Sequence, residues 1–317
     1  MGALVAEYYG KRTDASGAIE PVMFPDKPEK WPEGAKIPPC PFSCGNTCKK
    51  LKSQNEPVCS VRDQSGTLWL VCSERLCATK KDIPLCAHQQ KMLYDIARHV
   101  FSKDIDFDDV CVKREEPLSV IEGTNYHADY IMTTRSGRSS TSGPDRVVLE
   151  MQGGGETTNT GKLTSHVKSW KRLPSSNREN GYLSSMTAAS PLVTNAWRRQ
   201  QEQFLVKGNI AMKTWKGLGI AFCVGTLLYD YLMDRLKSAN LPDLSSYNWT
   251  LALIAIKEDS ESEVADGPIP LKVDESRILY TNYQTFVQAL INQGEPSMAA
   301  FTGGFIDLHS RDVEIPF

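Results

Sequence analysis

The sequence predicts an α/β protein with a mixed β-sheet, preceded along the chain by a small cysteine-rich module. Short strand-like runs recur after residue 108, and helical patterns alternate with them rather than forming a separate block, which is typical of an α/β core. Seven of the nine cysteines lie ahead of most of this core, within residues 40–86. We therefore expect two parts, an N-terminal segment with the cysteine-rich module at residues 1–88 and a core domain at residues 89–317.

The N-terminal part has little material for a hydrophobic core. Prolines interrupt residues 20–39 and oppose regular structure there. The strand-like run of the module is confined to residues 67–72, so the module needs another stabilising element, which a bound metal would supply. The clustered cysteines that offer ligands are Cys40, Cys44, Cys48, Cys59, Cys72, Cys77 and Cys86.

The core domain begins with an amphipathic helix predicted at residues 88–101. Strands are predicted at residues 108–114, 117–123, 125–134 and 145–152, and a Ser/Gly-rich hairpin loop joins the last two. The polar residues 153–190 are expected to be irregular. The remaining predicted elements are a helix at 191–212, a strand at 217–225, a helix at 226–239, strands at 249–259 and 276–283, and a helix at 283–293.

Charge and hydropathy exclude two classes of protein. Thirty-six Lys and Arg residues balance 38 Asp and Glu residues, for a net charge of -2, which excludes a histone-like, purely electrostatic nucleic-acid binder. No apolar run reaches the roughly 18 to 20 residues of a membrane span, and the first residues do not form a secretory signal. We expect a cytoplasmic protein, in which clustered thiols more often hold a metal than form disulfides.

Acidic side chains mark two neighbouring strands of the predicted core. Asp129 lies in one strand, and Glu150 and Gln152 occupy alternate positions of the next, so the latter two point to the same face. If the hairpin pairs these strands, Asp129 lies beside Glu150. Two carboxylates next to an amide form an oxygen-rich pocket for Mg²⁺, and the glycines at 153–155 would let a phosphate backbone approach.

This spacing resembles the PD-(D/E)XK nuclease pattern, with Gln152 in place of the usual Lys. The wider sequence resembles the NotI-type type II restriction endonucleases. The residues that carry the resemblance are AEYYGKR at 6–12, CPF at 40–42, WLVC at 69–72, VLEMQ at 148–152 and TNAWRRQQEQF at 194–204. It covers about residues 5–260 and implies a mixed-sheet PD-(D/E)XK-like nuclease core with a small N-terminal four-cysteine metal-binding module that supports DNA binding.

The resemblance also implies the site residues. Asp129, Glu150 and Gln152 would be catalytic, and Asp129 and Glu150 would hold the catalytic Mg²⁺. One structural metal ion would bind four cysteines, Cys40, Cys48, Cys59 and Cys72, with Cys44 as an alternative ligand. Iron and zinc both suit a tetrahedral thiolate site, and both remain open; an iron–sulfur cluster is disfavoured because the usual Cys-x2-Cys spacing is absent.

The function implied is Mg²⁺-dependent hydrolysis of double-stranded DNA at a palindromic, GC-rich site by a homodimer in a bacterial or archaeal cytoplasm. A cognate DNA methyltransferase would accompany the enzyme genetically rather than as a bound subunit. Candidate DNA contacts are Lys168, Arg198 and Arg199, because Arg reads guanine edges and Lys neutralises phosphates. His166 is a further candidate site residue in the same polar stretch.

Two other functions fit the same residues. A repair or recombination nuclease of loose specificity would share the catalytic core but would degrade DNA without discrete products. A non-catalytic metal-module DNA-binding protein would carry Asp129, Glu150 and Gln152 incidentally and would show no Mg²⁺-dependent cleavage. A third option, a metal-dependent oxidoreductase, lacks a nucleotide-binding glycine signature after a strand.

Overall fold

The computed structural model describes residues 2–22, 39–44, 47–52, 55–77, 81, 84–118, 123, 125–214, 218–262, 266–292 and 304–314. Most of the proline-rich run and part of the strand predicted at 117–123 lie outside these ranges. None of the helices in the described ranges is both long enough and apolar enough to cross a membrane.

A six-stranded mixed sheet forms the centre of the protein, as the sequence predicts. In spatial order, β12, β11, β10, β7, β6 and β5 lie side by side; β7, β10 and β11 run parallel, and the outer pairings are antiparallel. The strand bounds are β5 Val110–Leu118, β6 Tyr126–Thr134, β7 Arg146–Gln152, β10 Gly219–Gly225, β11 Leu251–Glu258 and β12 Leu271–Thr281.

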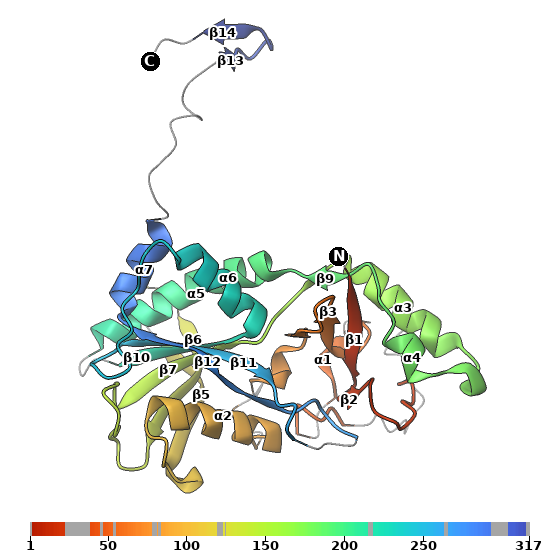
Figure 1. Ribbon diagram of the computed structural model, residues 1–317, viewed down its shortest axis with the longest axis horizontal. Coiled ribbons are helices and arrows are strands. Elements are labelled where there is room, and N and C mark those ends of the chain that lie inside the picture. Colours follow the sequence, from red (N-terminus) through yellow and green to blue (C-terminus); the bar gives the residue numbers. More distant parts are fainter. Residues whose placement is uncertain are drawn as a thin grey trace.

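Helices cover both faces of this sheet and divide its core into two layers (Figure 1). Helices α5 (Val193–Lys213), α6 (Thr226–Leu236) and α7 (Tyr283–Ile291) pack on one face, and α2 (Ala87–Val100) packs on the other. The even-numbered residues of β10, such as Phe222, face the three helices, whereas Ala221 and Cys223 face the α2 side. This alternation is what a central strand buried on both faces requires.

The N-terminal part contains its own four-stranded sheet, ordered β2-β1-β3-β4. Its elements are β1 Ala3–Tyr8, β2 Lys11–Arg12, α1 Lys49–Lys52, β3 Val58–Asp63, β4 Leu68–Leu70 and a 3-10 helix at Ser73–Arg75. Strand β1 lies ahead of the proline-rich run and is not among the elements predicted from the sequence. Its apolar residues are buried by pairing with β3, about 50 residues later in the chain, and this long-range partner supplies the order that local propensity did not indicate.

Two expectations are wrong. The stretch 153–190 contains β8 (Thr157–Thr158), α3 (Thr160–Arg172), a 3-10 helix (Ser175–Asn177), α4 (Asn180–Leu183) and β9 (Ser190–Pro191). Helix α3 buries only Leu163, Val167 and Trp170, a narrow stripe that its polar residues obscure.

The strands predicted at 108–114 and 117–123 are joined in β5, which continues through Pro117 because an edge strand tolerates a proline.

The remaining elements are a 3-10 helix, Phe107–Asp109, ahead of β5, and a C-terminal pair of strands, β13 (Gly304–Ile306) and β14 (Asp312–Glu314), which form an antiparallel hairpin.

A buried ion pair fixes the N-terminal sheet to the rest of the molecule. Glu7 on β1 is fully buried, and its carboxylate accepts hydrogen bonds from Arg75 Nη2 at 2.9 Å and Nε at 3.1 Å. The same carboxylate accepts from Ser60 Oγ at 2.6 Å and from the Ile269 backbone N–H at 2.7 Å. Four donors from three other segments thus satisfy one buried charge.

We expect Arg75→Met to lower the free energy of unfolding by about 3 to 5 kcal/mol, because it leaves the Glu7 charge buried and unpaired. Chemical denaturation measures the change. The matched control is Lys237→Met, which removes one partner of an exposed ion pair with Asp234 at 2.9 Å and should change stability by less than about 0.5 kcal/mol. Equal effects of the two variants would contradict the central role of the Glu7–Arg75 pair.

Candidate active site

The hairpin pairing of β6 with β7 is confirmed, and it places Asp129 beside Glu150. Tyr130 faces Leu149 in an antiparallel register, so the next position on each strand brings the two carboxylates together. Asp129 Oδ2 accepts a hydrogen bond from the Met151 backbone N–H at 2.9 Å. Burial raises the pKa of Asp129, since removing a carboxylate from water disfavours its charged form.

Glu150 lies deeper, beneath helix α5, where it is 2% exposed. Its Oε2 accepts a hydrogen bond from Lys207 Nζ at 2.7 Å, and Lys207 is equally buried. Its other oxygen, Oε1, is buried and has no hydrogen-bond partner among the described residues. The pKa of Glu150 is raised to about 8, chiefly by burial and also by the Asp129 charge, although the Lys207 ammonium opposes both.

Lys207 and Glu115 are two charged neighbours that the sequence did not single out. The pairs Arg114↔Tyr130 and Glu116↔Ala128 place Glu115 opposite Asp129 across β5 and β6, and its like charge contributes to raising the pKa of Asp129. Lys207 appears in the sequence only as one lysine in a long helical pattern, and its burial depends on how α5 packs on the sheet. The carboxylates of Glu115, Asp129 and Glu150 form a row across three strands, which becomes evident only from the pairing of those strands.

Gln152 points to the same face as Glu150 but lies nearer the end of β7. Its Nε2 donates to the carbonyl of Gly154, and its Oε1 accepts from Gln200 Nε2 of α5 at 2.7 Å. The amide is therefore held at both ends, by the chain that follows β7 and by the helix above it.

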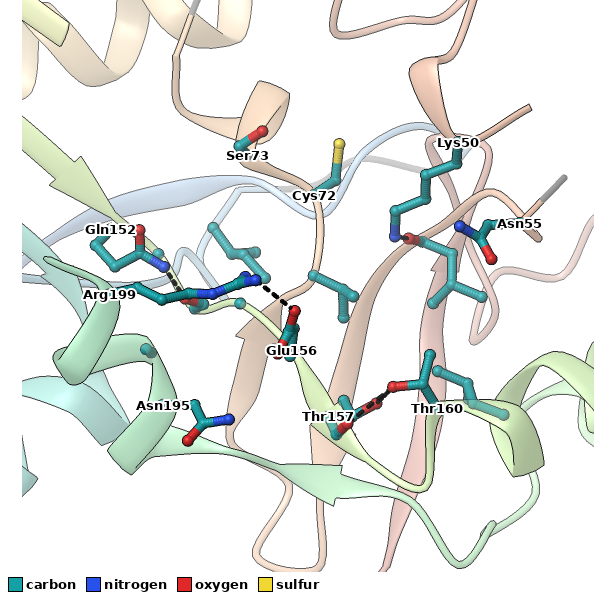
Figure 2. A pocket seen from close by; sticks show the side chains of 18 of the residues that line it. Lys50, Asn55, Cys72, Ser73, Gln152, Glu156, Thr157, Thr160, Asn195 and Arg199 are labelled. Carbon is teal, nitrogen blue, oxygen red and sulfur yellow. Dashed lines mark hydrogen bonds and ion pairs between the residues drawn. The ribbon is translucent and has the colours of Figure 1, made fainter. Parts of the chain in front are cut away.

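A cavity of about 470 Å³ opens at this end of β7, between the N-terminal sheet, α3 and α5. Figure 2 shows Gln152 and Arg199 on one side of it and Lys50 and Asn55 on the other. Arg199 forms an ion pair with Glu156 at 2.8 Å, so its charge is partly balanced within the wall. The wall is otherwise rich in amides and hydroxyls, groups that both donate and accept hydrogen bonds.

The glycines after β7 serve packing more directly than the expected approach of a phosphate backbone. A Cβ on Gly154 would lie 2.4 Å from the Leu70 carbonyl oxygen. Gly155 N–H donates to that same carbonyl at 2.9 Å, and Leu70 and Gly154 form an isolated parallel bridge. The absence of a side chain at Gly154 thus lets β4 lie against the end of β7.

The candidate DNA contacts lie on two different helices. Lys168 is exposed on α3, and Arg198 and Arg199 are exposed on the first turns of α5, with Arg199 lining the cavity. His166 has a structural environment instead, since its Nε2 lies 3.0 Å from the Tyr182 carbonyl oxygen and its ring stacks on Tyr182 with centroids 5.0 Å apart.

Four cysteines gather in the N-terminal part and are termed the thiol cluster: Cys40, Cys48, Cys59 and Cys72. The first three are buried together with Phe42 and Leu51, and Cys72 packs against them. Cys59 Sγ accepts a hydrogen bond from the Gly10 backbone N–H at 3.3 Å. The hydrogen bond between Cys40 and Cys48 lowers the pKa of Cys40 and raises that of Cys48, and burial raises the pKa of Cys59 and of Cys72.

Cys44 and Cys86 form a disulfide across a separation of 42 residues, whereas the sequence favoured metal binding over disulfides for the clustered thiols. The bond removes Cys44 as an alternative metal ligand. Cys77 belongs to neither set, because its Sγ lies 4.0 Å from the Met151 carbonyl oxygen and next to Asp129.

Within the described ranges, no three or more His, Cys, Asp or Glu side chains are arranged as a group that could hold a metal ion. The chemistry of two sets of residues nevertheless fits a cation. Asp129 and Glu150 offer hard oxygen ligands, and the unpartnered Oε1 of Glu150 is a buried acceptor for which the described residues provide no donor. The thiol cluster offers four sulfur ligands, as tetrahedral iron and zinc sites require.

The chain matches no known protein-family model and no sequence among the curated proteins.

We expect Mg²⁺ to stabilise the folded protein more at high pH than at low pH. The ordinary pKa of Glu150 is 4.5 and its folded-state pKa is about 8, so the buried group stabilises the fold in its neutral form and loses that contribution as pH rises toward 8. Because a cation binds the carboxylate, the Mg²⁺-induced rise in melting temperature should be larger at about pH 9 than at about pH 6. In Glu150→Gln the rise should be absent at both; a rise that does not depend on pH would exclude Glu150 as the ligand.

We expect Cys59→Ser to release a structural metal ion from the purified protein, because Cys59 is one of the buried thiols of the cluster. Elemental analysis should find about one iron or zinc ion per wild-type chain and much less in the variant. Cys111→Ser, which removes a free thiol on β5, is the control and should retain the metal. Equal metal content in both variants would argue against the thiol cluster as the ligand set.

Proposed function

We propose that the protein is a Mg²⁺-dependent endonuclease that cuts double-stranded DNA at a specific site. The observation that carries the proposal is the pair of adjacent carboxylates, Asp129 and Glu150, of which Glu150 has one buried oxygen with no hydrogen-bond partner in the described ranges. An unsatisfied buried carboxylate oxygen costs free energy in the isolated chain, and a divalent cation bound between the two strands would recover it.

Asp129 and Glu150 would hold the cation at the surface of the sheet. A bound Mg²⁺ supplies electrostatic stabilisation of the charge that develops on the phosphate and lowers the pKa of a water molecule. Asp129 is fixed for this role by the Met151 N–H, and Glu150 by Lys207. Helix α5 covers Glu150 and excludes bulk water, which strengthens the attraction between the carboxylate and the cation.

Gln152 would orient the phosphate or the attacking water. A neutral amide does not act as a base near neutral pH, so its contribution is hydrogen bonding from a fixed position. Its bonds to the Gly154 carbonyl and to Gln200 restrict the amide to the edge of the cavity. If Gln152 Nε2 donated to a substrate oxygen instead of the Gly154 carbonyl, Gln152 would contact the substrate without any movement of β7.

Specificity would come from the cavity and the N-terminal part that forms one of its walls. Asn55, Asn195 and Gln200 line it from two different parts of the chain, and amide side chains can distinguish the donor and acceptor patterns of base edges. Lys168 and Arg198, exposed nearby on α3 and α5, would contact phosphates and bases outside the cavity. A structural iron or zinc ion on the thiol cluster would hold this wall in place.

A homodimer acting on a palindromic, GC-rich site is part of the proposal and rests on the resemblance to NotI-type enzymes. Two-fold symmetry of the protein would match two-fold symmetry of such a site. A cognate DNA methyltransferase, encoded as a separate enzyme and not bound as a subunit, would protect host DNA in the same cytoplasm.

Digestion of several genomic DNAs in MgCl₂ tests the proposal. Wild-type protein should give discrete bands, and Asp129→Asn and Glu150→Gln should each lower the cleavage rate by at least about 100-fold, because each removes a charged cation ligand. Binding of DNA in CaCl₂ should be retained. Asp234→Asn, an exposed carboxylate on α6, is the matched control and should cut normally. A smear instead of bands would favour a nuclease of loose specificity, and no cleavage of any DNA would favour a non-catalytic DNA-binding protein.

A further inference from the structure

We infer that Lys207 is a positioning residue of this site, which holds Glu150 so that a single carboxylate oxygen faces the cation. The inference rests on the proposed function and adds a residue that lies outside the strand motif. It begins from the two unequal oxygens of Glu150. Lys207 Nζ donates to Oε2 at 2.7 Å, whereas Oε1 is buried and has no hydrogen-bond partner in the part of the chain that the structure describes.

The arrangement of α5 on β7 explains how the lysine reaches the strand. Gln200 and Lys207 are seven residues, or about two turns, apart, so they point to the same side of the helix. On the strand below, their partners Gln152 and Glu150 are two residues apart and share one face. Helix α5 therefore contacts both polar side chains of the motif, through bonds of 2.7 Å in each case.

Lys207 supplies, from helix α5, the positively charged side chain that strand β7 lacks. In the pattern that the sequence resembles, a lysine occupies the position of Gln152, two residues after the second acidic residue. Here the ammonium of Lys207, on helix α5, donates to the same acidic residue, Glu150. Its hydrogen bond fixes the rotation of the Glu150 carboxylate, so Oε1 is turned away from Lys207.

A purely structural ion pair would not be expected to have one hydrogen-bonded and one unpartnered carboxylate oxygen, as Glu150 does. Both partners are 2% exposed, and burying two charges is often no more stabilising than packing two apolar residues of similar size. A structural role is served best when every buried oxygen is hydrogen-bonded. Glu7, on β1 of the N-terminal sheet, illustrates that case, because its carboxylate accepts four hydrogen bonds. Glu150 accepts one side-chain hydrogen bond, from Lys207, and its Oε1 has no hydrogen-bond partner among the described residues.

Binding of Mn²⁺ without DNA, followed by electron paramagnetic resonance, tests the inference. Lys207→Met should weaken Mn²⁺ binding by about 10- to 100-fold, the usual effect of removing a group that orients a metal ligand. Lys207→Gln, whose amide can still donate to Oε2, should bind Mn²⁺ with an affinity between those of Lys207→Met and the wild type. Lys213→Met removes the same charge from the exposed end of α5 and should bind like the wild type.

The opposite result overturns the inference. If Lys207 only balanced charge in the absence of a cation, its removal would leave Mn²⁺ affinity unchanged or would raise it, because a competing positive charge is gone. If Lys207→Met does not fold, Lys207→Gln decides alone, since weaker binding supports the inference and equal or tighter binding contradicts it. In the cleavage assay, kcat should fall in the folded variant while the Kd for DNA in CaCl₂ stays at the wild-type value.

Glu150→Gln separates this inference from the proposed function. Loss of Mn²⁺ binding in Glu150→Gln with normal binding in Lys207→Met would contradict the positioning role alone. Normal binding in Glu150→Gln would place the cation elsewhere, and the proposed site and the inference would fail together.

Discussion

The Glu7 carboxylate is the constraint on which the position of the N-terminal sheet depends. It is fully buried, and its four donors come from Ser60 on β3, Arg75 after the thiol cluster and Ile269 before β12. A buried charge is tolerated only when it is paired and hydrogen-bonded, so these segments must meet at one point in the folded chain. Arg75 Nη2 also donates to the Ile269 carbonyl at 2.6 Å, which closes the network.

This network has consequences for the candidate site. It holds the N-terminal sheet against the core, and the Leu70–Gly154 bridge brings β4 to the end of β7. The cavity beside Gln152 lies between these two attachments and takes its lining from both parts of the chain. Residues 1–88 and 89–317 therefore form one continuous surface at the cavity, although their sequences differ in composition.

The sequence was sufficient for those features that depend on local pattern. Alternation along 145–152 placed Glu150 and Gln152 on one face, and the hairpin loop ahead of them indicated the pairing that brings Asp129 alongside. Lys207, Gln200 and Glu115 were not predicted as site neighbours, because their positions depend on the packing of α5 and on the register of β5, which are long-range interactions. Likewise, β1 pairs with a strand about 50 residues away, and α3 buries too narrow a stripe for its periodicity to be distinct.

The contact of α5 with β7 limits how this chain can change in length. One residue inserted between Gln200 and Lys207 would rotate the following part of the helix by about 100°, and Lys207 would leave Glu150 while Gln200 stayed on Gln152. One residue inserted between Glu150 and Gln152 would turn one of the two side chains to the other face of the sheet. Insertions and deletions in descendants of this sequence should therefore accumulate in loops such as residues 135–145 and avoid these two short intervals, even where single substitutions between them are tolerated.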